Sequence, residues 1–102
     1  MSVAELFDQA AERLVAGHED VQLGRIMNAT GLRTKGRFFG FVRQDELVVK
    51  LPAPRVSELI SSGEGGVFDA GKSRPMREWV TLQPADVEAC VAYLDEAREF
   101  VG

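Results

Sequence analysis

The chain contains few side chains that could perform catalysis. Its single cysteine is Cys90 and its single histidine is His18. A cysteine–histidine pair could supply an activated nucleophile, but Cys90 stands at an apolar position of a helical pattern, where cysteine behaves as a small hydrophobic residue. His18 lies between a helix end and two acids, and one cysteine with one histidine leaves no zinc-binding set. We therefore predict no enzyme activity, no metal site and no cofactor.

A glycine-rich segment has part of the spacing of a phosphate-binding P-loop. Residues 31–36 give the initial Gly-x4-Gly of that motif. Arg37 and Phe38 then stand where the motif needs Lys followed by Ser or Thr to contact phosphate and magnesium. The segment also joins two predicted strands, whereas a P-loop joins a strand to a helix. We exclude a P-loop on both grounds.

A basic segment in an otherwise acidic chain is the best candidate for a binding surface. The 102 residues carry 12 Lys and Arg against 16 Asp and Glu, a net charge of −4 at pH 7. Residues 25–55 carry seven basic residues against two acidic ones, whereas residues 1–24 and 56–102 are both acidic. The candidate residues for binding nucleic acid or an acidic partner are Arg25, Arg33, Lys35, Arg37, Arg43, Lys50 and Phe38.

Two interpretations of this basic segment stay open. Guanidinium groups on hairpins can contact phosphates, and exposed aromatic rings can stack on bases. Alternatively, the cations form a solvated face that balances the acidic helices, or that pairs with them across a dimer. The overall acidity of the chain favours the second interpretation, because nucleic-acid-binding domains are typically basic.

The first half of the chain predicts a helix followed by an antiparallel meander. Ser2 and Glu5 have the spacing of a capping box, and apolar residues recur at helical spacing up to Gly17. The runs that predict strands are residues 21–27, 31–34, 37–42 and 46–51. Lys35-Gly36 and Arg43-Gln44-Asp45 supply two of the turns. Alternation places Phe39 and Phe41 on one face of their strand, with Phe38 and Val42 on the other.

The second half predicts two helices around one further strand. Pro52-Ala53-Pro54 ends the meander, and a short helix follows and ends at Gly63. We expect a flexible loop at residues 63–66, a turn-rich crossing at 67–77, a strand at 78–82 and a helix that opens at Gln83-Pro84. The predicted fold is α+β, in the order α-β-β-β-β-α-β-α, with an antiparallel sheet packed against N-terminal, middle and C-terminal helices.

The length and the apolar runs indicate one domain over residues 1–102. No run approaches the roughly 20 apolar residues that cross a bilayer. The N-terminus lacks the basic and then apolar pattern of an export signal. We expect a cytoplasmic protein with no membrane partner.

The order of several short motifs is similar to a known family. The run Met27…Gly31-Leu32…Gly36-Arg37-Phe38-Phe39-Gly40-Phe41…Asp45-Glu46-Leu47-Val48-Val49-Lys50 resembles the TfoX/Sxy N-terminal domain. Arg74-Pro75-Met76-Arg77-Glu78-Trp79-Val80-Thr81-Leu82 resembles a strand shared with the related MmcQ/YjbR-like proteins. The resemblance covers nearly the whole chain. It implies an α+β fold with an antiparallel sheet, and similarity to small bacterial proteins related to regulators of competence for DNA uptake.

Two departures limit what the resemblance implies. Asn28-Ala29 stands where family members often have Phe-Gly-Gly, so no function of that hairpin is carried over from the family to this chain. The chain ends at Gly102, so we expect no counterpart of the C-terminal domain of full-length TfoX regulators. The family pattern supplies no catalytic residues to carry over.

Three hypotheses from different classes follow from the sequence. The first is a small non-enzymatic binding module, regulatory by similarity, whose basic segment contacts nucleic acid or an acidic protein. The second is a protein-interaction or self-associating domain, for example a homodimer, that binds no nucleic acid. The third is a small enzyme, which would need a pocket that joins His18 or Cys90 to other polar groups.

Overall fold

The first helix begins where its capping residues predict. The computed structural model describes residues 1–26, 28–69 and 75–102, and helix α1 spans Val3–Gly17. The Ser2 hydroxyl accepts a hydrogen bond from the Glu5 backbone N–H at 3.2 Å, and the Glu5 carboxylate accepts one from the Ser2 N–H at 3.0 Å. The Ser2 hydroxyl also donates to the Glu5 carboxylate at 3.1 Å. The two bonds that this carboxylate accepts, first that from the Ser2 backbone N–H and then that from the hydroxyl, stabilise its charged form and lower the pKa of Glu5.

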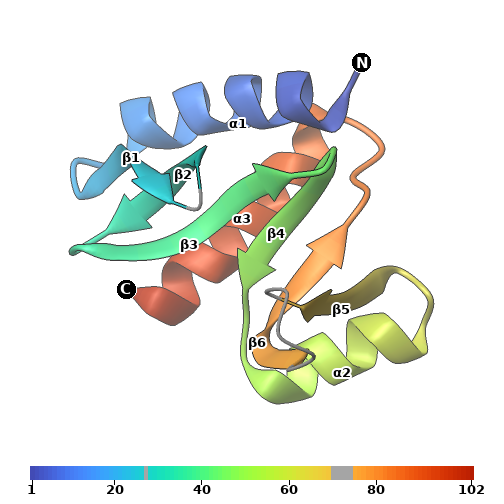
Figure 1. Cartoon of the computed structure of the whole chain (residues 1–102). Coiled ribbons are helices and arrows are strands. Elements are labelled where there is room, and N and C mark those ends of the chain that lie inside the picture. Colours follow the sequence, from blue (N-terminus) through green and yellow to red (C-terminus); the bar gives the residue numbers. More distant parts are fainter. Residues whose placement is uncertain (27, 70–74) are drawn as a thin grey trace.

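Six strands form one antiparallel sheet (Figure 1). The strands are β1 (Val21–Ile26), β2 (Ala29–Thr34), β3 (Arg37–Arg43), β4 (Glu46–Lys50), β5 (Gly65–Asp69) and β6 (Pro75–Leu82), in the spatial order β1-β2-β3-β4-β6-β5. Helix α2 (Ala53–Ser61) lies between β4 and β5 in the chain, and α3 (Val87–Val101) follows β6. The turn residues Lys35, Gly36, Gln44 and Asp45 all have positive φ, as tight two-residue hairpins require.

The structure confirms the α+β class and adds one strand to the predicted order. The sequence predicts a loop at residues 63–66, but Gly65 and Gly66 pair with Leu82 and Thr81 as the start of β5. A Cβ atom at Gly65 would lie 2.7 Å from the Val80 side chain, so glycine permits this close pairing. The observed order is α-β-β-β-β-α-β-β-α. The expectations for Met27 and for residues 70–74 lie outside the described residues.

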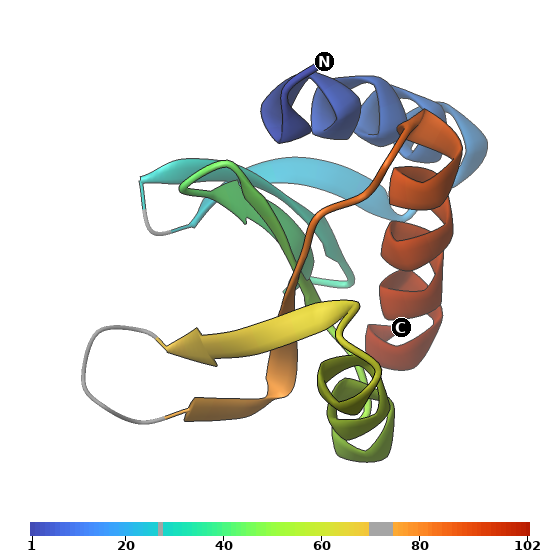
Figure 2. The ribbon, with the colours of Figure 1, turned by 90° about the vertical axis from the view of Figure 1, so that its right-hand side faces the viewer.

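All three helices cover the same face of the sheet (Figure 2). Helices α1 and α3 pack on each other and on the strands of the meander, and α2 packs on β5 and β6. The main core lies between the helices and the sheet, and its fully buried members include Leu32, Phe39, Val49, Val80, Cys90 and Leu94. We call this the helix side. The opposite surface of the sheet, which no described helix covers, is called the open face.

A bulge in β3 decides which phenylalanine side chains reach the open face. Leu32 pairs with Gly40 and Arg33 pairs with Phe38, so Phe39 is an extra residue on β3. Phe39 belongs to the main core, whereas Phe41 belongs to a separate cluster on the open face. The prediction that Phe39 and Phe41 share a face is therefore wrong, because the extra residue shifts the alternation by one position.

Candidate binding surface on the open sheet face

Aromatic side chains from three strands meet on the open face. Phe41 of β3, Phe68 of β5 and Trp79 of β6 have ring centroids 5.6 to 6.4 Å apart, in tilted and edge-to-face arrangements. Phe41 and Phe68 are buried, and Trp79 is half-buried. Together with Val48 they form a small second core, which is the apolar floor of the open face.

Phe38 adds a partly exposed ring at the other end of this face. Gly24 and Gly31 are paired across β1 and β2. A Cβ atom at Gly24 would lie 3.0 Å from the Phe38 ring, and one at Gly31 would lie 3.1 Å from it. The two glycines therefore leave the room that the Phe38 side chain occupies.

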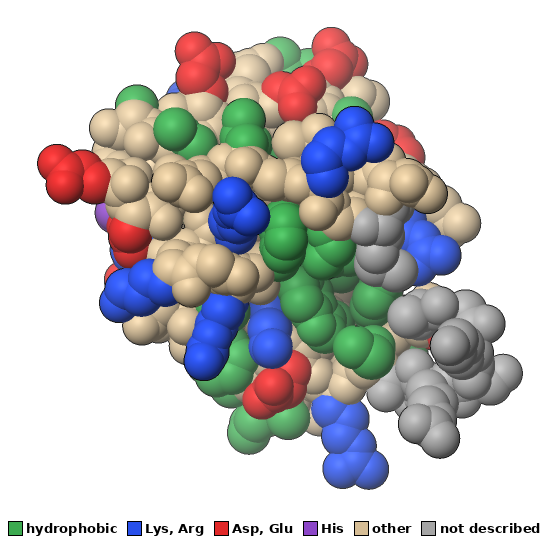
Figure 3. Space-filling view, turned by 60° about the vertical axis from the view of Figure 1, so that its left-hand side comes forward, with side chains coloured by type: hydrophobic (Ala, Val, Ile, Leu, Met, Phe, Trp, Pro, Cys, Tyr) green, Lys and Arg blue, Asp and Glu red, His purple; other side chains and the backbone are tan. Residues whose placement is uncertain are grey.

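Three cations lie on the open face beside these rings. A Cβ atom at Gly24 would also contact the Arg33 side chain, which places Arg33 next to Phe38. The Arg43 guanidinium carbon lies 5.7 Å from the Phe68 ring centroid, and the Lys50 Nζ lies 5.9 Å from the Trp79 ring centroid. Both distances are within cation–π range. Seen obliquely in Figure 3, hydrophobic side chains gather at the centre of this surface with Lys and Arg side chains around them.

The structure separates the seven predicted binding residues into two groups. Arg33, Phe38, Arg43 and Lys50 share the open face. Arg25 pairs with Thr30 and Arg37 pairs with Thr34, positions that alternate with open-face residues and so lie on the helix side. Lys35 lies in the β2–β3 turn, with its Nζ 3.5 Å from the Gly102 backbone oxygen.

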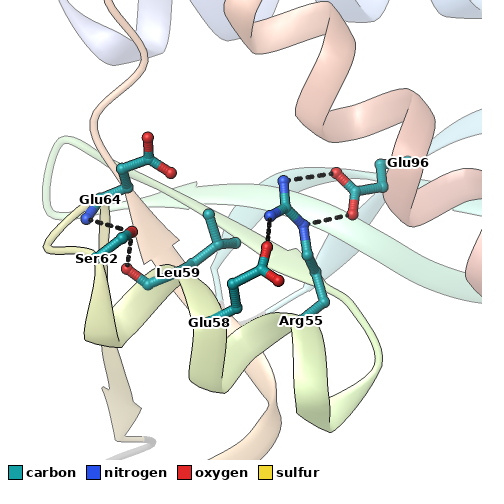
Figure 4. Close-up of polar contacts among 6 residues, drawn as sticks. All are labelled: Arg55, Glu58, Leu59, Ser62, Glu64 and Glu96. Atoms are coloured by element: carbon teal, nitrogen blue, oxygen red, sulfur yellow. Dashed lines mark hydrogen bonds and ion pairs between the residues drawn. The ribbon is translucent and has the colours of Figure 1, made fainter.

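The cations of the sheet differ from those of the helices in their partners. Arg13 and Glu88 form an ion pair at 2.6 Å, and the Arg98 Nε lies 2.8 Å from an Asp95 carboxylate oxygen. Arg55 of α2 pairs with Glu58 and, at 2.8 Å, with Glu96 of α3 (Figure 4).

The hydrogen bond to Glu96 stabilises the charged guanidinium and raises the pKa of Arg55. In contrast, the cations of strands β1 to β4 form no ion pair with any described residue; they are Arg25, Arg33, Arg37, Arg43 and Lys50.

Arg43 also has unused hydrogen-bonding capacity. Its Nη1 atom is shielded from solvent and has no hydrogen-bond partner among the described residues. A hollow of about 240 Å³ adjoins this side chain and is lined by Phe68, Thr81 and the acidic residues Glu46 and Asp69 among others. The open face is therefore basic near β1 to β3 and of mixed charge near β5.

Sequence reasoning missed the aromatic floor. Phe68 and Trp79 join the site through the pairing of β6 with both β4 and β5, and Lys50 lies in register with Trp79. A second hollow, of about 450 Å³, includes Lys50, Trp79 and Arg77 in its lining. The neighbouring segment is predicted as a turn-rich crossing, so no sequence pattern indicated these contacts.

The residues proposed for enzyme chemistry lie apart from this surface. Cys90 is fully buried in the main core, and desolvation raises the pKa of its thiol to about 11. His18 follows α1 at the surface, with its Nε2 3.8 Å from an Asp95 carboxylate oxygen. Within residues 1–26, 28–69 and 75–102, no three His, Cys, Asp or Glu side chains are grouped as metal ligands would be.

Comparisons with known proteins leave the family open. No protein-family model, no curated protein and no solved structure matches this chain. The resemblance to the TfoX/Sxy N-terminal domain therefore stays a prediction. None of the described helices has the length and apolar character to cross a membrane.

Proposed function

We propose that the protein is a small non-enzymatic binding module that takes up single-stranded nucleic acid on its open face. One observation supports this above all others. Arg33, Arg43 and Lys50 form no ion pair with a described residue, and each lies beside an aromatic ring on the same uncovered surface. A single strand needs both kinds of side chain, because cations bind its phosphates and aromatic rings stack on its bases.

The rings favour a single strand over a duplex. Bases inside a duplex are already stacked on their neighbours, so their faces are not available to protein side chains. The bases of a single strand can stack on aromatic residues, and their backbone can follow a basic groove. Phe38 and Trp79 are both partly exposed and lie beside Arg33 and Lys50 respectively.

The resemblance to the TfoX/Sxy N-terminal domain adds a biological setting to the proposal. It would make the module a regulator in a bacterial cell. The alternative partner is an acidic protein. Its carboxylates would bind the same three cations, but it has no bases to stack on the aromatic rings. The two partners are therefore distinguished by how much binding depends on the aromatic side chains.

Salt dependence is the first test. A labelled single-stranded DNA oligonucleotide is titrated with the protein, and binding is followed by fluorescence anisotropy. Three phosphate contacts predict that affinity falls about 20-fold when salt rises from about 50 to about 200 mM. Absence of salt-sensitive binding at micromolar protein would sink the proposal. Equal affinity for an acidic polypeptide such as polyglutamate would support the acidic-protein alternative.

A pair of matched double variants locates the binding face. Arg33→Ala with Lys50→Ala removes two cations from the open face. Arg25→Ala with Arg37→Ala removes the same charge from the helix side. We expect the first pair to lower affinity at least about tenfold and the second to have a much smaller effect. Equal losses in the two pairs would mean that general charge attraction, and not the open face, binds the oligonucleotide.

A further inference from the structure

A second candidate binding surface is an exposed apolar hollow on the helix side, where α1 meets the edge of the sheet. A hollow of about 520 Å³ is bounded by one side of α1 and by the β1–β2 hairpin. Its lining is mainly apolar and includes Ala11, Val15 and Leu23. Leu23 is 53% exposed and Val15 is 39% exposed, so the molecule leaves apolar surface here in contact with water.

The hollow lies beside an exposed edge of the sheet, which is formed by strand β1. β1 is the outermost strand on this side of the sheet, and its pairing along residues 21–26 involves β2 alone among the described strands. Alternate backbone N–H and C=O groups of an edge strand point away from its neighbour and can pair with another strand. Gln22, Leu23 and Arg25 of this strand are exposed.

The hollow has charges of both signs at its rim, so the rim of one copy of the chain is complementary to the rim of a second copy. Asp8 and Glu12 of α1 line the hollow and give it an acidic rim. Arg25 lies on the same side of β1, and none of these three residues forms an ion pair with a described residue. A basic or an acidic peptide would satisfy one sign of charge only. A second copy of this chain brings an acidic rim, a cation, an apolar centre and a strand edge together.

We propose that this surface is the interface of a homodimer in which two β1 strands pair antiparallel about a two-fold axis. Leu23 and Val15 of each protomer cover the apolar centre of the other, and Arg25 faces the acidic α1 rim of the partner. The interface is isologous, so each feature is used twice. Pairing at the β1 edge leaves both open faces uncovered and on the same side of the joined sheet, so the dimer does not depend on the function proposed above.

Leu23 and a residue on the opposite sheet edge give a matched test. Sedimentation velocity over a range of concentrations should show a reversible dimer of the wild-type chain. Leu23→Glu should raise the dimer dissociation constant at least about tenfold, because it places a charge in the apolar centre. Val67 is 56% exposed on the outer strand β5, so Val67→Glu matches the change at the other edge and should leave the dimer unchanged.

Circular dichroism shows whether each variant is folded, which separates lost pairing from lost structure. A monomer at every concentration would overturn the proposal. In that case the charge of the exposed Arg25 would serve to keep the β1 edge in contact with water and unpaired. Equal weakening by folded Leu23→Glu and Val67→Glu would overturn it as well.

Charge reversal tests the proposed contact between the protomers. Arg25→Glu should weaken the dimer, because the new carboxylate faces Asp8 and Glu12 of the partner. Adding Asp8→Lys and Glu12→Lys to that variant should restore part of the lost affinity. Failure of the combined variant to recover any affinity would contradict this arrangement of the two copies.

Discussion

Cys90 is a buried core residue with an unreactive, neutral thiol. It lies in the same core cluster as Leu94 and Ala97, and none of its surface is exposed. Desolvation raises the pKa of the thiol from an ordinary value of 9.0 to about 11, so the neutral thiol is the stable form in the folded protein. Ionising the thiol in the folded protein therefore needs a more alkaline pH than in the unfolded chain.

Alkaline pH should therefore destabilise the fold through Cys90. Its pKa is raised in the folded state, so its stabilising contribution is complete below about pH 9 and is lost as the pH rises towards 11. We expect the free energy of unfolding to fall by on the order of 2 kcal/mol over that range. Urea unfolding of the wild type and of Cys90→Ala isolates this effect, because the variant lacks the thiol. A native thiol that reacts with iodoacetamide at neutral pH as fast as free cysteine would contradict this account.

Phe38 allows a test of stacking at a single residue. Phe38→Leu keeps an apolar side chain over Gly24 and Gly31 but removes the ring. We expect affinity for the oligonucleotide to fall at least about fivefold while the salt dependence stays the same, because stacking does not release counterions. Phe100 of α3 is 39% exposed, and Phe100→Leu is the matched control that should not change affinity. Unchanged binding by Phe38→Leu would remove stacking at this position from the proposal.

At the scale of elements, local signals predicted the helix start and the hairpin turns, because their chemistry lies within a few residues. Ser2 with Glu5 and Lys35 with Gly36 are examples. The bulge at Phe39 could not be predicted, since counting alternate residues assumes that no residue is extra. β5 was missed because Gly65 and Gly66 are typical of loops, and only pairing with β6 makes them a strand.

Gly40 shows how tightly β3 packs against α3. A Cβ atom at this position would lie 2.3 Å from the Leu94 Cδ2. Gly40→Ala should therefore destabilise the protein by about 1 to 3 kcal/mol, because the core has to shift to accept a methyl group. The control is Gly17→Ala, since nothing lies within 4 Å of a Cβ atom there. Urea unfolding should show the loss in Gly40→Ala alone, and equal stability of the two variants would contradict the packing described.

At the scale of the whole molecule, the distribution of ion pairs explains the charge pattern of the sequence. The acids of α2 and α3 form ion pairs with the helix cations, and the five cations of strands β1 to β4 have no acidic partner within the described residues. The sequence predicted four members of the open-face site, but not that Arg25, Arg37 and Lys35 lie elsewhere. It also could not predict the aromatic floor, because β3, β5 and β6 bring together residues that are distant in the chain.

Trp79 offers the most direct test of nucleic-acid binding at the open face. It is the only tryptophan of the chain, and it lies on the open face with Lys50 beside it. Titration with a single-stranded oligonucleotide should quench its fluorescence in a saturable manner, and added salt should restore the emission. An oligonucleotide that binds by anisotropy while the emission of Trp79 stays unchanged would contradict binding at this face.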